Sequence, residues 1–157
     1  MAEPAIPLDA IDRRLLNLLQ DDSSQTNQTL AERAHLSAPT CLRRVKRLVE
    51  AGVIERQIAV VSAALAEAGL TAIVEITLDN QAAERMAEFE RRVSSEPAVQ
   101  QCYRVSPGPD FVLVLQVADM PAYHALVHRV FTADANVRNV RAFFSVHRAK
   151  FAPKVAL

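Results

Sequence analysis

The hydrophobic pattern of the chain changes its period near residues 57–68, and this change constrains the fold more than any other feature of the sequence. Before this segment, apolar residues recur three or four positions apart, the spacing of one helix face. After it, β-branched apolar runs alternate with helical stretches. We therefore predict an α+β protein with two domains, residues 1–60 and 69–157, joined by a linker at 61–68.

Three short helices are predicted in the first domain. The first runs from about Asp9, a good N-cap, to about Asp21, and the second from Thr26 or Asn27 to Ala34. The third begins after Ser37 and stops at Gly52, with Pro39 in its first turn, where a missing N–H costs nothing. The apolar residues expected to face the core share helical spacing; they are Ile11, Leu15, Leu18, Leu19, Leu30, Ala31, Ala34, Cys41, Leu42, Val45, Leu48 and Val49.

The segment after the third helix suits a short hairpin or wing, because Val53, Ile54 and Ile58 are β-branched. Three short helices with a tight turn between the second and the third are the arrangement of a helix-turn-helix. The first domain is therefore predicted to be a winged helix-turn-helix.

The second domain is predicted to follow the order βαββαβ of a ferredoxin-like sandwich. Its expected strands are residues 70–78, 99–106, 111–118 and 137–147, and its expected helices are 81–95 and 120–131. The inward faces of these helices are expected to carry Ala82, Met86, Phe89, Val93, Tyr123, Leu126, Val127 and Val130.

The strand at 111–118 carries information about assembly. From Phe111 to Val117 its apolar residues do not alternate with polar ones, which indicates that both faces of the strand are buried. The two helices of a ferredoxin-like fold cover only one face of the sheet. A second copy of the same sheet is the simplest cover for the other face, so we predict a homodimer through the C-terminal sheets.

Basic charge is concentrated on the third helix. The chain as a whole is neutral, with 18 basic and 18 acidic residues, whereas residues 37–49 hold four cations and no acid. In a helix-turn-helix the exposed face of this helix enters the major groove of double-stranded DNA. The predicted DNA-binding residues are Ser37, Pro39 and Thr40 near base edges, and Arg43, Arg44, Lys46 and Arg47 at phosphates or guanines. The alternative is an ordinary helix whose basic face is only solvated.

Other kinds of site have little support in the sequence. No signal peptide or membrane span is recognisable, and Cys41 and Cys102 are isolated, as expected of reduced thiols in a cytoplasmic protein. His124 and His128 have a spacing that can bind metal, but no third ligand is near in sequence. There is no phosphate-binding glycine loop and no nucleophile motif, so we expect no cofactor, no metal and no enzymatic activity.

Two segments of the first domain resemble the Lrp/AsnC (feast/famine) family of transcriptional regulators. They are residues 8–16 (LDAIDRRLL) and residues 36–48 (LSAPTCLRRVKRL) followed by Gly52 and Ile54. The second half resembles that family's effector-binding and assembly domain (RAM-type), through Val74-Glu75-Ile76 and through Val105-Ser106 with Asp110-Phe111. The resemblance extends from about Leu8 to Lys150.

The resemblance implies a dimer that assembles further into tetramers or octamers, and DNA binding that responds to a small molecule, usually an amino acid. The effector would lie against the loop between the second and third strands, contacting Ser106, Pro107, Gly108 and Asp110. Members often carry Gly-Asp-x-Asp there, whereas this chain has Pro107 and Gly108 at the first two positions. Asp110 is expected to bind a ligand ammonium group. The alternative is a simple Pro-Gly turn in which Asp110 satisfies turn amides.

The sequence therefore predicts a sequence-specific transcriptional regulator modulated by a small effector. The alternative is an amino-acid-sensing binding module whose first domain contacts other proteins. The two differ in one measurable property, because only the regulator should bind duplex DNA with an inverse dependence on salt.

Overall fold

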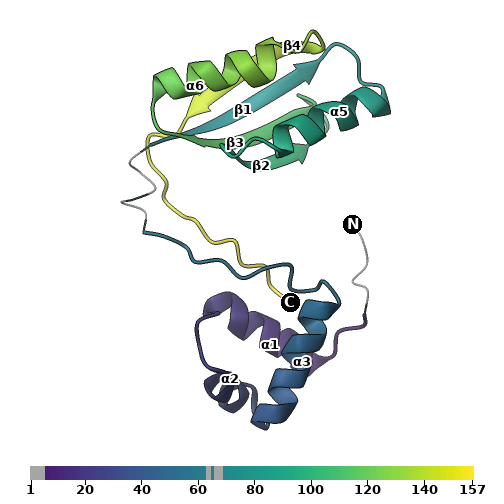
Figure 1. Ribbon diagram of the computed structural model, residues 1–157, viewed down its shortest axis with the longest axis vertical. Coiled ribbons are helices and arrows are strands. Elements are labelled where there is room, and N and C mark those ends of the chain that lie inside the picture. Colours follow the sequence, from purple (N-terminus) through teal and green to yellow (C-terminus); the bar gives the residue numbers. More distant parts are fainter. Residues whose placement is uncertain (1–5, 63–64, 66–68) are drawn as a thin grey trace. The chain divides into compact units, whose positions relative to one another are not determined.

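The computed structural model describes residues 6–62, 65 and 69–157 and divides the chain into two compact units (Figure 1). The first unit comprises Met1–Val60 together with Lys150–Leu157, and the second comprises Val61–Ala149. Five positions of the linker predicted at 61–68, residues 63–64 and 66–68, lie outside the described residues. In the described part of the chain, no helix combines the length and the apolar character that a membrane span requires.

The first unit contains the three predicted helices, α1 (Ala10–Asp21), α2 (Asn27–Ala34) and α3 (Ala38–Glu50). Asp9 caps α1 by accepting a hydrogen bond from the Asp12 N–H, and the Asp12 carboxylate accepts one from the Asp9 N–H in return. Thr26 caps α2 because its hydroxyl oxygen accepts a hydrogen bond from the N–H of Thr29. These caps explain why both helices begin where the sequence predicts.

The turn between α2 and α3 depends on a left-handed residue. His35 has φ 57°, and its N–H and that of Leu36 donate to the carbonyls of Glu32 and Ala31, which closes the end of α2. Ser37 then occupies the N-cap position of α3, although its hydroxyl bonds to Thr40 Oγ1 and not to a backbone amide. Gly52, with φ +70°, ends the segment as predicted.

The buried face of α3 is narrower than the sequence predicts. Cys41 and Leu48 are fully buried, but Leu42 is 59% exposed and Val49 is 51% exposed. The prediction was wrong for these two residues because α1 and α2 together cover only a narrow stripe of α3. The core cluster of the unit is made of Leu15, Leu30, Ala31, Ala34 and Cys41.

The hairpin predicted around Val53, Ile54 and Ile58 is not formed. After α3 the chain turns, with the N–H groups of Val53 and Ile54 both donating to the carbonyl of Leu48, and the described residues 55–62 contain no strand. Ile58 is 63% exposed. An isolated two-stranded hairpin has little stability in water, so this segment stays unpaired without a third strand or a layer to pack against.

The second unit has the predicted βαββαβ order, and its sheet is antiparallel in the order β2-β3-β1-β4. Its elements are β1 (Leu70–Leu78), α5 (Ala83–Ser94), β2 (Val99–Arg104), β3 (Phe111–Val117), α6 (Met120–Leu126), the π-helical turn η1 (Val127–Thr132) and β4 (Val137–Phe144). The helix predicted at 120–131 thus changes to π-helix after Leu126. Ala82, predicted to be buried, is an exposed N-cap residue.

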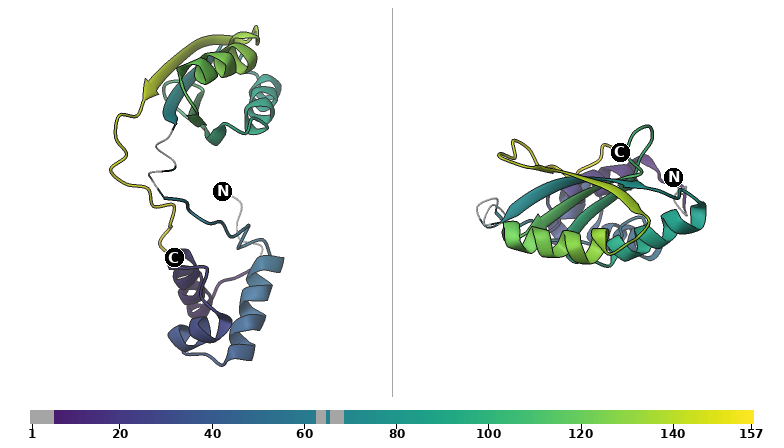
Figure 2. Two further views of the ribbon diagram at one scale, coloured as in Figure 1. Left: turned by 60° about the vertical axis from the view of Figure 1, so that its left-hand side comes forward. Right: turned by 90° about the horizontal axis from the view of Figure 1, so that it is seen from above.

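Both helices cover the same face of the sheet (Figure 2). The residues of β1 and β3 that point to this face alternate along each strand, as a half-covered sheet requires. Phe89 of α5 lies at the centre, with its ring centroid 4.8 Å from that of Phe111 and 6.5 Å from that of Phe131. The fully buried strand residues of this core are Ala72, Val74, Ile76, Phe111, Leu113 and Leu115.

The opposite face of the sheet is apolar at its centre and has no layer over it among the described residues of this unit. Val112 and Val114 are half-buried there, while Ile73 and Phe143 are each 42% exposed and Tyr103 is 53% exposed. Ile73 pairs with Val114 on one side and with Phe143 on the other, so the apolar side chains are contiguous across three strands. We call these five residues the open sheet face.

Candidate nucleic-acid interface

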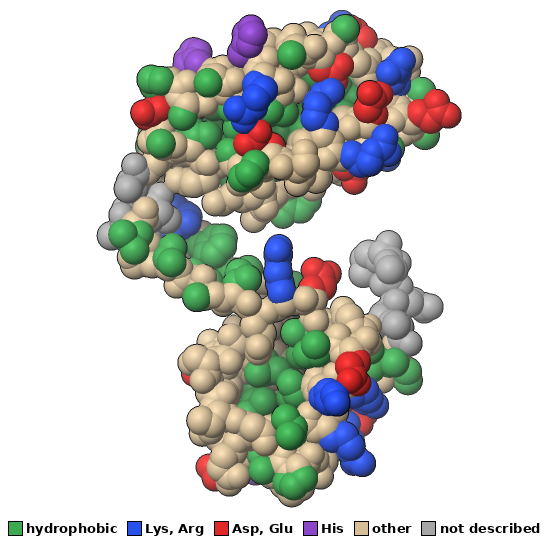
Figure 3. Space-filling view, in the orientation of Figure 1, with side chains coloured by type: hydrophobic (Ala, Val, Ile, Leu, Met, Phe, Trp, Pro, Cys, Tyr) green, Lys and Arg blue, Asp and Glu red, His purple; other side chains and the backbone are tan. Residues whose placement is uncertain are grey.

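The cations of α3 divide into two groups. Arg44 and Arg47 extend to acids at the start of α1, whereas Arg43 is exposed and, within the described residues, joins no ion pair. Lys46 lies 3.7 Å from Glu50 one turn later, but both side chains are largely exposed, so this pair is weak. In Figure 3 most of the Lys and Arg side chains visible on the first unit gather along one edge, beside α3.

Asp12 is the centre of the first group. Its carboxylate is fully buried, and its Oδ1 accepts a hydrogen bond from Arg44 Nη1 at 2.8 Å while its Oδ2 accepts one from Arg47 Nη2 at 2.5 Å. Arg44 Nη1 also donates to Asp9 Oδ2 at 2.7 Å. Asp12 of α1, its N-cap residue Asp9 and two arginines of α3 therefore form a neutral cluster, which we call the α1–α3 ion cluster.

The hydrogen bonds within the cluster shift the pKa values of Asp9 and Arg44 in the directions that favour their charged forms. The pKa of Asp9 is lowered, first by the hydrogen bond from the Asp12 N–H and then by the one from Arg44. The pKa of Arg44 is raised, first by its bond to Asp9 and then by its bond to Asp12. Both pKa shifts favour the charged forms of Asp9 and Arg44, which are the forms that make the salt bridge between them.

The predicted acid-free face of α3 is therefore only partly free of acids. Spacing within one helix carries no information about Asp12, which lies 32 positions from Arg44. The sequence does contain a sign of this pairing, because Asp12 occupies an inward position of α1 together with Leu15 and Leu16. A buried acid on one helix and an excess of cations on the next indicate a pair between them.

The remaining predicted residues form the outward edge of α3. Ser37, Pro39 and Arg43 are exposed, and Thr40 is half-buried, with its hydroxyl bonded to that of Ser37 at 2.8 Å. The side chain of Arg47 is 47% exposed, and its guanidinium has more donors than the single Nη2 bond to Asp12 uses. This edge presents hydroxyls at its first turn and cations behind them, which can contact base edges and phosphates.

The loop between β2 and β3, predicted as the effector site, has one buried member. Ser106, Pro107 and Gly108 are exposed, whereas Asp110 is only 8% exposed. The Asp110 carboxylate accepts a hydrogen bond from the Leu78 N–H at 2.7 Å, and the Asp110 N–H donates to the Ile76 carbonyl. Asp110 thus holds the loop against the end of β1, and the amide that its carboxylate satisfies belongs to this strand and not to the turn.

The histidines and cysteines lie apart from both regions. His124 on α6 and His128 on η1 are exposed, and no group of three potential metal ligands occurs within residues 6–62, 65 and 69–157. Burial raises the pKa of the Cys41 thiol and that of the Cys102 thiol, so neither is an activated nucleophile.

Sequence models of known families match both units. The model of a winged helix-turn-helix DNA-binding domain matches residues 8–55, and the model of the Lrp/AsnC ligand-binding domain matches residues 71–155. A leucine-responsive regulatory protein of Rhizobium meliloti is 37% identical over 152 residues, covering 97% of this chain and 97% of that protein.

Solved structures agree with these matches. An AsnC family transcriptional regulator of Agrobacterium tumefaciens has a TM-score of 0.85 at 31% identity, covering 94% of this chain and 96% of that one. A transcriptional regulator of Neisseria meningitidis, solved as a complex with L-Met, has a TM-score of 0.84 at 28% identity, covering 95% and 96%.

Proposed function

Because the chain belongs to the Lrp/AsnC family of transcriptional regulators, we propose that it binds specific DNA sites through the outward edge of α3. Ser37, Pro39 and Thr40 approach base edges, and Arg43, Lys46 and Arg47 contact phosphates or guanine. Arg44 was predicted to act with them, but its side chain is only 23% exposed and is bound to two carboxylates. We therefore assign Arg44 to holding α3 in place and the other six residues to DNA.

The observation that carries this proposal is the division of charge on α3. In a helix whose basic face is only solvated, the arginines are not held by a buried acid. In this chain Asp12 orients two arginines of α3. Here Asp12 fixes the helix from behind, while Arg43 projects forward without a protein partner in the described part of the chain. Such preorganisation reduces the ordering cost of binding.

The DNA-binding form in this proposal is a dimer. A second copy covers the open sheet face, since contiguous apolar surface of this kind marks an interaction site. A dimer presents two α3 helices, so the DNA site has two related half-sites whose separation follows the helical repeat. Assembly of dimers into tetramers or octamers is the further state that the family resemblance implies.

The second unit is proposed to bind the effector, an amino acid or a related metabolite. The structurally similar Neisseria meningitidis regulator was solved with L-Met, which supports this ligand class. Ser106, Pro107 and Gly108 are the exposed part of the proposed contact loop, and Asp110 anchors it. The effector changes DNA affinity through a coupling free energy of about 1–3 kcal/mol.

A DNA-binding regulator works where the DNA is, so the proposed location is the cytoplasm. The family is one of regulators, and the proposal assigns no catalytic step to the chain. The competing role, an amino-acid-sensing module whose first unit binds proteins, predicts no affinity for duplex DNA.

Fluorescence anisotropy with duplex DNA at several salt concentrations separates these roles. The regulator should bind more weakly as salt rises, because cations on the protein displace counterions from phosphates. Arg43→Ala should reduce the slope of log affinity against log salt by about 1, or cost about 1–3 kcal/mol of discrimination if Arg43 reads a base. Arg85→Ala, which removes an exposed arginine from α5, is the matched control. Binding that does not depend on salt would contradict the proposal.

The effector proposal is tested by a thermal-shift screen of amino acids and 2-oxo acids. A true ligand should raise the melting temperature in a concentration-dependent manner. Replacing Ser106 by Ala should weaken that shift and leave the melting temperature of the free protein unchanged, since Ser106 is exposed. If no compound stabilises the protein, the effector part of the proposal fails while the DNA part remains testable.

A further inference from the structure

The outer surface of α1 contacts a segment that is distant in sequence but belongs to the same unit. Asn17, Gln20 and Asp21 of α1 all bond to residues 154–157, which lie more than 130 positions later. This surface is separate from the α1–α3 ion cluster, which Asp12 forms on the buried side of the helix.

Gln20 makes the most informative of these contacts. Its Nε2 donates to the carbonyl of Val155 at 3.0 Å, and its Oε1 accepts from the N–H of Val155 at 2.8 Å. The side-chain amide therefore pairs with both backbone groups of one residue, as a neighbouring strand would. This is the backbone recognition used when an extended peptide is bound.

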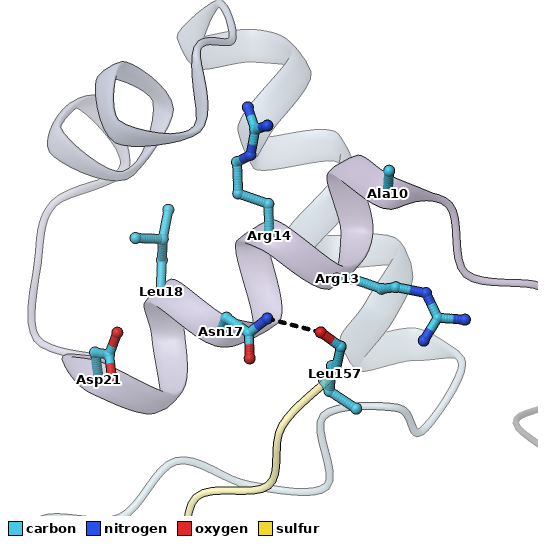
Figure 4. Close-up of a pocket in the computed structure, with 7 residues that line it drawn as sticks. All are labelled: Ala10, Arg13, Arg14, Asn17, Leu18, Asp21 and Leu157. Carbon is cyan, nitrogen blue, oxygen red and sulfur yellow. Dashed lines mark hydrogen bonds between the residues drawn. The ribbon is translucent and has the colours of Figure 1, made fainter.

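Three further features place the segment in one register. Asn17 Nδ2 donates to the carbonyl of Leu157 at 3.1 Å, two residues beyond Val155, as expected of an extended chain. Lys154 Nζ lies 2.5 Å from Asp21 Oδ1. The side chain of Leu157 lines an open pocket of about 440 Å³ together with Ala10, Arg13 and Leu18 (Figure 4).

We propose that the outer face of α1 is a peptide-binding site whose ligand is the chain's own segment Lys154–Leu157. The backbone is held by Asn17 and Gln20, and selectivity comes from a cation at position 154 and an aliphatic side chain at position 157. The inference concerns the first unit alone and does not depend on DNA binding.

Tethering explains how such an exposed site stays occupied. Each hydrogen bond lies at the surface, where water competes with it, so a free peptide of this sequence would bind weakly. The segment is covalently attached to the chain that carries α1, which favours this contact over the binding of a free peptide. The first unit is then joined to the second at two points, near Val60 and near Lys150.

Amide hydrogen exchange of the full chain, measured by NMR, tests the site. The N–H of Val155 should exchange about tenfold or more slowly than that of Val146, a fully exposed valine in the same chain that serves as an internal reference. In Gln20→Ala the exchange of Val155 should rise to the rate of Val146. Gln28→Ala, an exposed position on α2, is the matched control and should leave Val155 protected.

A second variant tests the same contact from the other side. Val155→Pro removes the donor without altering α1, so the side-chain NH2 resonances of Gln20 should shift while the backbone amides of α1 keep their exchange rates. The site is refuted if Val155 and Val146 exchange equally in the unaltered chain, or if Gln20→Ala leaves Val155 slowed. Protection that appears only as protein concentration rises would assign the segment to a second copy and refute the intrachain site.

Discussion

At Asp12 a buried carboxylate faces two arginines, and all three groups depend on one another. The acid is expensive to bury alone, and the cations compensate for that cost by hydrogen bonding to both of its oxygens. Removing either arginine leaves Asp12 with one cationic partner in place of two, and removing Asp12 takes an acidic partner from both arginines. The consequences differ between Arg44 and Arg43, although the two are adjacent in sequence and identical in chemistry.

Arg44→Ala is predicted to lower the free energy of unfolding of the first unit by about 1–2 kcal/mol. The value is below that of a fully buried pair because Arg44 is partly solvent-accessible and Asp12 keeps Arg47. Arg43→Ala should change stability by less than about 0.5 kcal/mol, as an exposed substitution does. Urea denaturation followed by circular dichroism measures both. Equal losses for the two variants would argue against the different roles given to them.

Asp134 is predicted to make stability fall in acid. Desolvation raises its pKa, but the Asn136 N–H and the Arg92 guanidinium lower it more, so the net pKa lies below the ordinary 3.8. A lowered folded-state pKa stabilises the protein above pH 3.8, and that contribution is lost as pH falls through the folded value. Asp134→Asn should therefore lose less stability than the unaltered chain between pH 5 and pH 2.

The measurement is urea denaturation across that pH range, with Asp79→Asn as the control. Asp79 is exposed and lies 4.0 Å from Arg138, so its substitution should leave the acid-dependent loss nearly intact. A profile for Asp134→Asn that is as steep as that of the unaltered chain would contradict the assignment.

At the scale of elements, packing against Phe89 holds α5 to the sheet. Its ring is 1% exposed and contacts Phe111 and Phe131. Phe89→Ala is predicted to cost about 3–5 kcal/mol, the range for large aromatic deletions in a core. Glu84→Ala on the exposed face of the same helix is the control. A loss below about 1 kcal/mol in denaturant titration would show that the space left by the ring is refilled.

The helices and strands could be predicted from the sequence where residue type and hydrophobic spacing within the segment determine them. The caps at Asp9 and Thr26, the stop at Gly52 and the four strands follow from residue type and spacing. The π-helical turn after Leu126 did not follow, because a single extra residue in a helical turn leaves no trace in a pattern of period 3.6. The prediction of a hairpin after α3 was wrong, because β-branched residues favour a strand conformation but do not by themselves provide a second strand to pair with.

The candidate sites were predictable only in part. Helical spacing located the exposed residues Pro39, Arg43 and Lys46 of α3, although the same spacing wrongly buried Leu42 and Val49. The division of its arginines could not, since it depends on α1 residues 32 or more positions away. Similarly, the loop at 106–110 was located correctly between two strands, but the bond from the Leu78 N–H to Asp110 depends on tertiary folding.

At the scale of the whole molecule, the open sheet face should control assembly. Val114 lies near its middle, paired with Ile73 on one side and Gln101 on the other. Val114→Glu is predicted to weaken the proposed dimer strongly, because an unpaired charge would be buried at the interface. Sedimentation velocity measures this, and Ala125→Glu, an exposed position on the helical side, is the control. A dimer that survives Val114→Glu would move the interface elsewhere.

The return of residues 150–157 to the first unit also has a consequence for the order of synthesis. A ribosome makes α1, α2 and α3 first, but the segment that covers α1 emerges only after the whole of the second unit. Domains usually fold as they leave the ribosome, amino-terminal domain first. Here the helices of the first unit are synthesised early, but its segment 150–157 is synthesised after the second unit. A nascent chain stalled inside the second unit therefore has an α1 surface that this segment does not yet contact.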